Sequence, residues 1–519
     1  MDFAVHRPHQ RLGRSEHVLA NIAQDLSRFL VRVQRSLRFK TLHLSRHQRE
    51  TLASILVEFA EDLHQDIGIW RALEHYNLTE FGTPLPCILQ PNEAMNRAAI
   101  NPARIQYLLW TLYQELRPEL IMAPNHADLA RMATEVATFL RTRFASVRGD
   151  SGVKNFLATP DTYGWEVKRK LVWLGQHSYF FRLHCEHYVQ DHGGKPDIPT
   201  LDDFLCQETT SWSGLGVIDL LAALLPLTAA QRADLRYWYE RHFGYFRVLS
   251  VHGPFLEVVN VLNERTYKVR VDESAPWFQR YQLIFGGLVP WEGVWYWSGE
   301  QRGFSSVTED LIQQIRREFP RRAPQIVYRY CESLAEKARA TVSQHYQQFM
   351  DYHGNDLVIY PNGNALAEGM QKFHRYQLDS APKENVDAFL KKHHLSELPA
   401  PEINLPPTLL NCDNGIGVYF NPQEGQEMIA NFDAIISGLK KQGEQLTETE
   451  KKGIGSLIRE DAVSPNFVHR IVQDYGDASI AAVFLIPPES GQYYLEYLLR
   501  RYKGHFYRNR YPNIALVDY

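Results

Sequence analysis

Residues 244–271 read GYFRVLSVHGPFLEVVNVLNERTYKVRV and open the stretch from Gly244 to Gly299 that decides the fold. Short runs rich in valine, tyrosine and phenylalanine are separated there by turn sequences such as His252-Gly253-Pro254, which is typical of β-hairpins. The runs are Tyr245–Val251, Phe255–Val261, Thr266–Val271, Gln282–Val289 and Val294–Ser298. Runs and turns at this spacing predict a small antiparallel meander that curls into a barrel-like, SH3-like module over residues 244–303.

Helical periodicity surrounds this stretch on both sides. Ile22, Leu26, Phe29, Val33 and Leu37 fall on one helical face, and Ser45-Arg46-His47-Gln48 is a capping-box pattern that begins a second helix. The predicted fold class is therefore α+β and predominantly α-helical. Its expected parts are an α-helical array over residues 1–243, the β module over 244–303, a helical segment with one short strand over 304–378, a linker over 379–407, and a mostly helical C-terminal domain over 408–519.

The composition is that of a globular protein, because 44% of the 519 residues are hydrophobic and 22% are charged. Single hydrophobic cores stop growing near about 250–300 residues, so this length predicts about two to four domains. The net charge of −4 provides no overall attraction to nucleic acid or to an anionic membrane. Any basic binding site must therefore be local.

Cysteine usage indicates the compartment. The five cysteines are widely scattered and never form a Cys-x-x-Cys pair, which is typical of a reducing environment. No run of about 18 apolar residues occurs in the sequence. We therefore expect a cytoplasmic protein without a membrane span.

A basic and aromatic tail is the first candidate site. Five cations near the C-terminus, Arg500, Arg501, Lys503, Arg508 and Arg510, are interleaved with Tyr502, Phe506, Tyr507 and Tyr511. Such a mixture can clamp a phosphate backbone and stack on bases, provided that it lies open to solvent. Arginine stacked on tyrosine also stabilises ordinary helix junctions, which is the alternative. A second basic cluster consists of Arg316, Arg317, Arg321 and Arg322.

Tryptophans of the β module are the second candidate site. Trp291, Trp295 and Trp297 lie close together in the sequence, and strand alternation sends Trp295 and Trp297 to one face and Tyr296 to the other. Exposed rings on a small barrel bind peptides, nucleic acids or neighbouring domains. Packing of these rings against the flanking helices is the alternative.

A histidine cluster is the third candidate site. His177, His184 and His187 lie on a helix predicted over Trp165–Gln190, and that spacing could present imidazoles to zinc or iron. In that case Glu186 or Asp191 would serve as the base of a metal-dependent hydrolase. Packed or surface histidines are the alternative, because the sequence contains no His-Glu-x-x-His element.

Several phrases of the sequence are distinctive. Besides the tail they are Asp66-Ile-Gly-Ile-Trp70, Gly82-Thr-Pro-Leu-Pro86, Leu171-Val-Trp-Leu-Gly-Gln-His-Ser-Tyr179, Trp212-Ser-Gly-Leu-Gly216 and Phe285-Gly-Gly-Leu-Val-Pro-Trp291. In these phrases the chain resembles a family of uncharacterised bacterial proteins, a domain of unknown function that spans nearly the whole length. The resemblance implies a bacterial origin and carries no activity, cofactor or catalytic residue.

Three functions remain open. The first is a non-catalytic cytoplasmic binding or scaffold protein whose partner is nucleic acid or a ribonucleoprotein, and it is favoured because the sequence shows no complete phosphate loop, dinucleotide fingerprint, zinc motif or catalytic triad signature. The second is the metal-dependent hydrolase. The third is a component of a regulatory or defence system that binds another protein. No cofactor is predicted, and enzyme status stays open.

Overall fold

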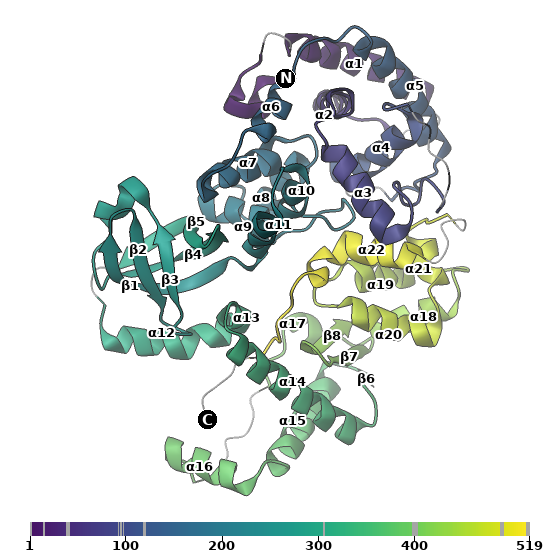
Figure 1. The fold of residues 1–519 in the computed structure, drawn as a ribbon. Coiled ribbons are helices and arrows are strands. Elements are labelled where there is room, and N and C mark those ends of the chain that lie inside the picture. Colours follow the sequence, from purple (N-terminus) through teal and green to yellow (C-terminus); the bar gives the residue numbers. More distant parts are fainter. Residues whose placement is uncertain are drawn as a thin grey trace.

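The computed structural model describes residues 3–13, 16–37, 42–91, 93, 96, 98–117, 121–304, 307–396, 403–487 and 493–514. The described chain is mostly helical, with two small β-sheets (Figure 1), which confirms the predicted α+β fold class. Among these residues no helix combines the length and the apolar character needed to cross a membrane.

Helices make up the N-terminal part of the chain. Two short 3-10 helices, η1 (Phe3–His6) and η2 (Pro8–Gln10), precede them. The helices are α1 (His17–Ser36), α2 (Arg46–Gln65), α3 (Ile69–Phe81), α4 (Pro102–Leu116), α5 (Ala127–Phe144), α6 (Gly152–Ala158), α7 (Gly164–His177), α8 (Arg182–Asp191), α9 (Ile198–Gln207), α10 (Val217–Leu224) and α11 (Ala229–Tyr237). The predicted capping box is present at Ser45 and Gln48, where it begins α2.

Helix α2 lies in the interior of this array, because every residue from Leu52 to Asp62 is buried. Three of these residues are acids, and each has its own partner. Glu58 pairs with Arg182 of α8 at 2.6 Å, and Glu61 pairs with Arg7 at 2.6 Å. A buried charge is tolerated when it is paired and hydrogen-bonded, so these pairs fix the neighbours of α2.

Asp62 forms hydrogen bonds to the start of α3 and does not pair with a cation of the described residues. Its carboxylate accepts hydrogen bonds from the backbone N–H groups of Gly68 at 2.7 Å, Ile69 at 3.1 Å and Trp70 at 2.7 Å, and from the Tyr179 hydroxyl at 2.7 Å. The first N–H groups of a helix have no partner within the helix itself. Asp62 therefore determines where the second of two consecutive helices begins.

The β module follows η4 (Trp238–Glu240). Its strands are β1 (His242–His252), β2 (Phe255–Asn260), β3 (Thr266–Arg270), β4 (Leu283–Trp291) and β5 (Val294–Phe304). They close into one sheet in the order β1-β2-β3-β5-β4, and β1 also pairs with β4, as Phe246 opposite Ile284 shows.

The predicted antiparallel meander is wrong in two respects. After β3 the chain passes through the 3-10 helix η5 (Asp272–Trp277), so β4 pairs with β1 instead of β3. The sheet then closes through a parallel pairing of Val269 in β3 with Trp295 in β5. The sheet is consequently mixed, and the SH3-like character stays a prediction.

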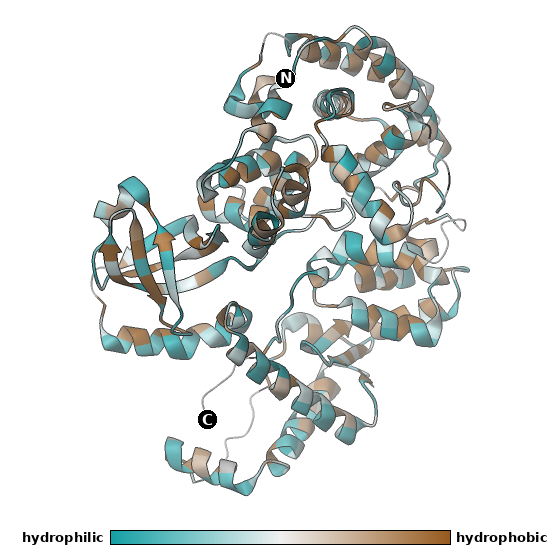
Figure 2. Cartoon of the chain, viewed as in Figure 1, coloured by the Kyte–Doolittle hydropathy of each residue, from teal (hydrophilic) through white to brown (hydrophobic). Residues whose placement is uncertain are grey.

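The C-terminal half begins with α12 (Glu309–Arg322), which crosses the β module and buries Ile312 and Ile315 against it. Most of α12 is hydrophilic (Figure 2). The following elements are α13 (Pro324–Tyr328), α14 (Glu332–His353), β6 (Leu357–Tyr360), α15 (Gly363–Asp379), α16 (Lys383–His393), α17 (Pro407–Leu410), β7 (Ile416–Asn421), β8 (Gly425–Ala430), α18 (Phe432–Lys440), α19 (Glu448–Arg459), α20 (Pro465–Tyr475), α21 (Ala478–Val483), α22 (Tyr494–Lys503) and η7 (Gly504–Tyr507).

The second sheet joins two parts of the sequence. Strand β6 pairs with β7 across the predicted linker, with Tyr360 opposite Ile416, and β7 pairs with β8. Helices α19, α21 and α22 pack together beyond this sheet and approach the N-terminal array (Figure 1). This contact between the two ends of the chain positions the candidate site.

We predict that Asp62→Ala lowers the free energy of unfolding by about 3 kcal/mol, because four donors lose their acceptor in a buried place. Denaturant unfolding measures the change. Asp25→Ala is the matched control, since Asp25 forms partly exposed pairs with Arg28 and Arg143 and its loss costs about 1 kcal/mol or less. Equal effects of the two substitutions would contradict this account of α3.

Candidate anion-binding site

The basic tail packs onto the rest of the chain. Arg501 is 3% exposed and Lys503 is 0% exposed. Arg500 pairs with Glu80 of α3 at 2.9 Å and with Glu496 at 3.1 Å. The expectation that these side chains lie open to solvent is therefore wrong for Arg501 and Lys503.

Two more tail arginines have partners within the chain. Arg508 donates hydrogen bonds to the backbone oxygens of Gln207 at 2.5 Å and Glu208 at 3.0 Å, and it lies 3.6 Å from Asp219. Its guanidinium also lies 3.6 Å from the centre of the Tyr239 ring. Arg510 pairs at 2.6 Å with Glu424, in the turn between β7 and β8. Stacking and pairing within the chain was the alternative reading of this tail.

A close backbone contact brings the tail to the loop between α9 and α10. A Cβ placed on Gly504 would lie 2.6 Å from the carbonyl oxygen of Gly214, which is too near for any other residue type. Gly214 itself has a φ of +78°, a conformation that favours glycine. The segment Trp212–Gly216 therefore packs directly against the backbone of the tail.

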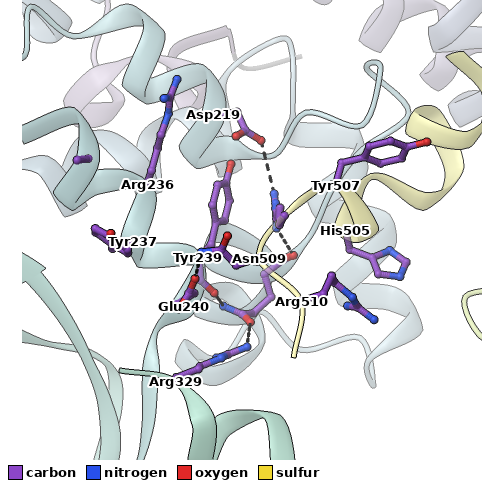
Figure 3. Close-up of a pocket in the computed structure, with 13 residues that line it drawn as sticks. Asp219, Arg236, Tyr237, Tyr239, Glu240, Arg329, His505, Tyr507, Asn509 and Arg510 are labelled. Atoms are coloured by element: carbon purple, nitrogen blue, oxygen red, sulfur yellow. Dashed lines mark hydrogen bonds and ion pairs between the residues drawn. The ribbon is translucent and has the colours of Figure 1, made fainter. Parts of the chain in front are cut away.

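One cavity of about 450 Å³ lies where the tail passes α11 (Figure 3). Its charged and polar lining residues come from five elements and include Asp219, Arg236, Tyr237, Tyr239, Glu240, Arg329, Tyr507, Arg508 and Arg510. Figure 3 shows Arg236 pointing away from Arg329, so these two guanidinium groups do not converge. Glu240 accepts hydrogen bonds from Asn509 and Tyr511, and Arg508 and Arg510 are paired. Glu240, Arg508 and Arg510 are thus engaged within the chain, whereas Arg329 donates, among the described residues, only to the neutral oxygens of Arg241 and Gln207.

A second cavity, of about 540 Å³, lies between the N-terminal array and the C-terminal helices. We call it the interdomain cavity. Glu115 of α4, His187 and Asp191 of α8, and Ser211 line one side. Arg459 of α19 with Arg501 and Tyr502 of α22 line the other side. Residues from two candidate sites of the sequence, the tail and the histidine cluster, thus come together here.

The two guanidinium groups converge on one ring. Arg459 lies 5.6 Å and Arg501 lies 5.9 Å from the centre of the Tyr502 ring. Arg501 donates to the Tyr497 hydroxyl at 2.9 Å and to the Gln114 side-chain oxygen at 2.5 Å, while its buried Nε has no hydrogen-bond partner. Neither arginine forms an ion pair with a carboxylate of the described residues. Among the described residues neither guanidinium has a counterion, and Arg501 is the buried one of the two.

Glu115 organises the opposite side. It lies 3.1 Å from His184 Nε2 and 3.1 Å from His187 Nδ1, and it accepts a hydrogen bond from Ser211 Oγ at 2.9 Å. Burial alone would raise the pKa of Glu115, but these partners hold that pKa well below its ordinary value. The hydrogen bond to Glu115 raises the pKa of His187. Glu115 is thus ionised and already fully engaged.

The predicted histidine site does not form as expected. A single helix over 165–190 is wrong: α7 ends at His177 and α8 begins at Arg182, because Ser178 is extended and its hydroxyl accepts from the N–H of Phe181 at 3.3 Å. The break removes His177 from the register of His184 and His187. No group of three or more metal-binding side chains occurs in the part of the chain that the structure describes.

Ser211 and His184 also differ from a nucleophile and its base. Ser211 Oγ lies 2.8 Å from His184 Nε2, but its hydroxyl also bonds Glu115. The Nδ1 of His184 is buried without a partner, whereas a catalytic triad places its orienting carboxylate at that atom. This arrangement buries polar groups and fixes the cavity wall.

The tryptophans of the β module have mainly packing roles. Trp291 is buried beside Trp238, and Trp295 and Trp297 pack on the interior cluster of the module, opposite to Tyr296, as strand alternation predicts. Trp277, in the same module, is instead 80% exposed. The predicted face of Trp291, Trp295 and Trp297 is therefore not a continuous exposed surface.

Sequence reasoning found Arg501, Tyr502, His184 and His187 but missed Arg459 and Glu115. Both residues lie on ordinary amphipathic helices, and neither belongs to a local cluster. No signal in the sequence marks them, because their relation to Arg501 arises from packing between distant helices.

We predict a pH-dependent contribution from Lys503. Burial lowers its pKa from 10.5 to about 8. The folded chain therefore binds this proton less tightly than the unfolded chain, and stability increases as pH rises from about 8 towards about 10.5, by about 2 to 3 kcal/mol at about pH 10. To isolate the contribution of Lys503, the free energy of unfolding is measured for the wild type and for Lys503→Met at about pH 7 and at about pH 10. An equal pH response in both proteins would contradict it.

Comparison with known proteins concerns the N-terminal helices. No curated protein and no solved structure matches the chain. One family model matches about a third of the chain, and the matched part includes the segments Asp66–Trp70 and Gly82–Pro86. The resemblance had implied a match over nearly the whole length, so the matched part is shorter than expected. Residues 42–203, which contain α2 to α8 and the start of α9, match the family described as a protein of unknown function, DUF3843.

Proposed function

We propose that the protein is a non-catalytic binding protein that holds an organic anion in the interdomain cavity. The observation that carries this proposal is Arg501, a guanidinium that is 3% exposed, lines the cavity and has no carboxylate partner among the described residues. An uncompensated buried charge costs several kcal/mol. An anionic ligand offsets that cost.

Arg459 adds a second reason. Its guanidinium lies over the Phe484 ring at 5.2 Å and shares the Tyr502 ring with Arg501. Both guanidinium groups line the cavity, and a carboxylate with two oxygens can accept hydrogen bonds from two such groups. Stacking on rings keeps both guanidinium planes in place before a ligand arrives, which limits the entropy lost on binding.

The remaining lining supports a ligand with an apolar body. Trp110, Phe484, Ile486 and Leu498 line the same cavity and are buried. The volume of about 540 Å³ falls within the range of small-molecule sites, about 300–1,000 Å³. Because the walls belong to distant parts of the chain, a bound ligand would also bridge them and stabilise their contact.

We predict that 3-phenylpropionate, an apolar monocarboxylate, binds saturably in isothermal titration calorimetry. Arg459→Met should weaken binding about tenfold, because one charge-assisted hydrogen bond is lost. Arg321→Met removes an arginine from exposed α12 and is the matched control, with unchanged affinity expected.

Two results would contradict the proposal. One is the absence of saturable binding by 3-phenylpropionate. The other is equal affinity in the wild type and in Arg459→Met, with circular dichroism showing that both are folded.

Nucleic acid remains a second candidate partner, through a different surface. Arg316, Arg317, Arg321 and Arg322 are all exposed on α12, and Arg317 and Arg321 form no ion pair with a described residue. Cations on one exposed helix are suited to phosphate contacts.

We predict that purified protein freed of nucleic acid retards single-stranded RNA at low ionic strength, and that Arg317→Glu combined with Arg321→Glu abolishes the retardation. Arg28→Glu combined with Arg32→Glu on α1 is the control, because this double variant changes the net charge by the same amount on a different helix. A salt-independent shift, or equal loss in both double variants, would exclude a site on α12.

A further inference from the structure

Asp191 gives the interdomain cavity a second kind of charge. This residue ends α8 on the side opposite Arg459 and Arg501, and it is exposed to the cavity. Asp191 forms no ion pair with a described residue, whereas Glu115 is engaged by His184, His187 and Ser211. Asp191 is therefore the carboxylate that is left for a positive group of a ligand.

The cavity has arginines on one wall and carboxylates on the other, and this arrangement restricts the charges that a ligand can carry. A dianionic phosphate would meet the two guanidinium groups but also the carboxylates of Asp191 and Glu115, which repel it. A ligand with one carboxylate and one ammonium group satisfies both walls. Gln114 and Gln190, which also line the cavity, are neutral and can bond either group.

The apolar part of the cavity selects among such ligands. Phe484, Ile486 and Leu498 stand beside the arginines on the C-terminal wall, and Trp110 stands on α4. Burial of apolar surface contributes about 25 cal/mol per Å², so a large apolar side chain gains more here than a polar one.

We propose that the interdomain cavity binds a free α-amino acid with a large apolar side chain. This inference rests on the proposed function and extends it. The carboxylate lies at Arg459 and Arg501, the ammonium group at Asp191, and the side chain against Phe484 and Ile486. The amino acid thereby joins α8 to α19 and α22.

The test compares L-phenylalanine with three relatives by isothermal titration calorimetry on the full chain. The ligand 3-phenylpropionate lacks the ammonium group, L-phenylalaninamide lacks the carboxylate, and Gly-Gly-Phe carries its ammonium two residues away from its carboxylate. We expect L-phenylalanine to bind at least about tenfold more tightly than each relative, because each relative loses one charge-assisted contact.

Variants assign the contacts. Asp191→Asn should weaken L-phenylalanine about tenfold and leave 3-phenylpropionate unchanged, whereas Arg459→Met should weaken both. Both positions are exposed, so the test does not depend on the buried Arg501. Glu186→Gln, a carboxylate on the same helix that does not line the cavity, is the matched control and should leave both affinities unchanged.

The outcomes separate the two proposals. Equal affinity for 3-phenylpropionate and L-phenylalanine, or no effect of Asp191→Asn, overturns the amino-acid inference while the anion site stands. Gly-Gly-Phe binding as tightly as L-phenylalanine overturns a free amino acid in favour of a peptide C-terminus. Failure of 3-phenylpropionate to bind saturably overturns the proposed function and, with it, the inference that rests on that function.

Discussion

One hydrophobic core joins the N-terminal helices to the C-terminal helices α19 to α22, and ion pairs of the C-terminal segment add to this contact. Arg500 reaches Glu80 of α3, Arg508 reaches Asp219 of α10, and Arg510 reaches Glu424 between β7 and β8. Each pair is partly exposed, and a single pair of this kind contributes about 1 kcal/mol or less. Together they join the N-terminal helices, the C-terminal sheet and the last helix at one place, so the basic character of the tail serves folding first.

The arginines of the C-terminal segment are of two kinds, those that pair with a carboxylate and one that does not pair with a carboxylate of the described residues. Arg500, Arg508 and Arg510 have carboxylate partners within the chain. Arg501, between them in sequence, lines the interdomain cavity, where its partners among the described residues are the neutral side chains of Tyr497, Gln114, Trp110 and Tyr502. A folded chain that buries a charge without a counterion sacrifices stability. The anionic ligand that we propose would supply the missing charge and so give a physical reason for that sacrifice.

The β module illustrates the same distinction for aromatic residues. Trp291 joins the module to η4 through Trp238, and Tyr296 packs edge-on against Trp165 of α7 at 5.4 Å. Such contacts bury large rings and fix the module against the helices. A high density of tryptophan in a sequence therefore says little about binding until the partner of each ring is known.

Much of the secondary structure could be predicted from the sequence, because helix caps and strand alternation depend on neighbours within a few residues: the Ser45 capping box and the five strand runs are examples. The site could be predicted only in part. Arg501, Tyr502, His184 and His187 attracted attention through composition, but their meeting with Arg459 and Glu115 required α4, α8, α19 and α22 to pack together. Tertiary structure alone decided that β4 lies beside β1 and which arginines keep a counterion. The reason is that a charge is neutralised by whatever long-range packing brings near it, and local sequence does not specify that neighbour.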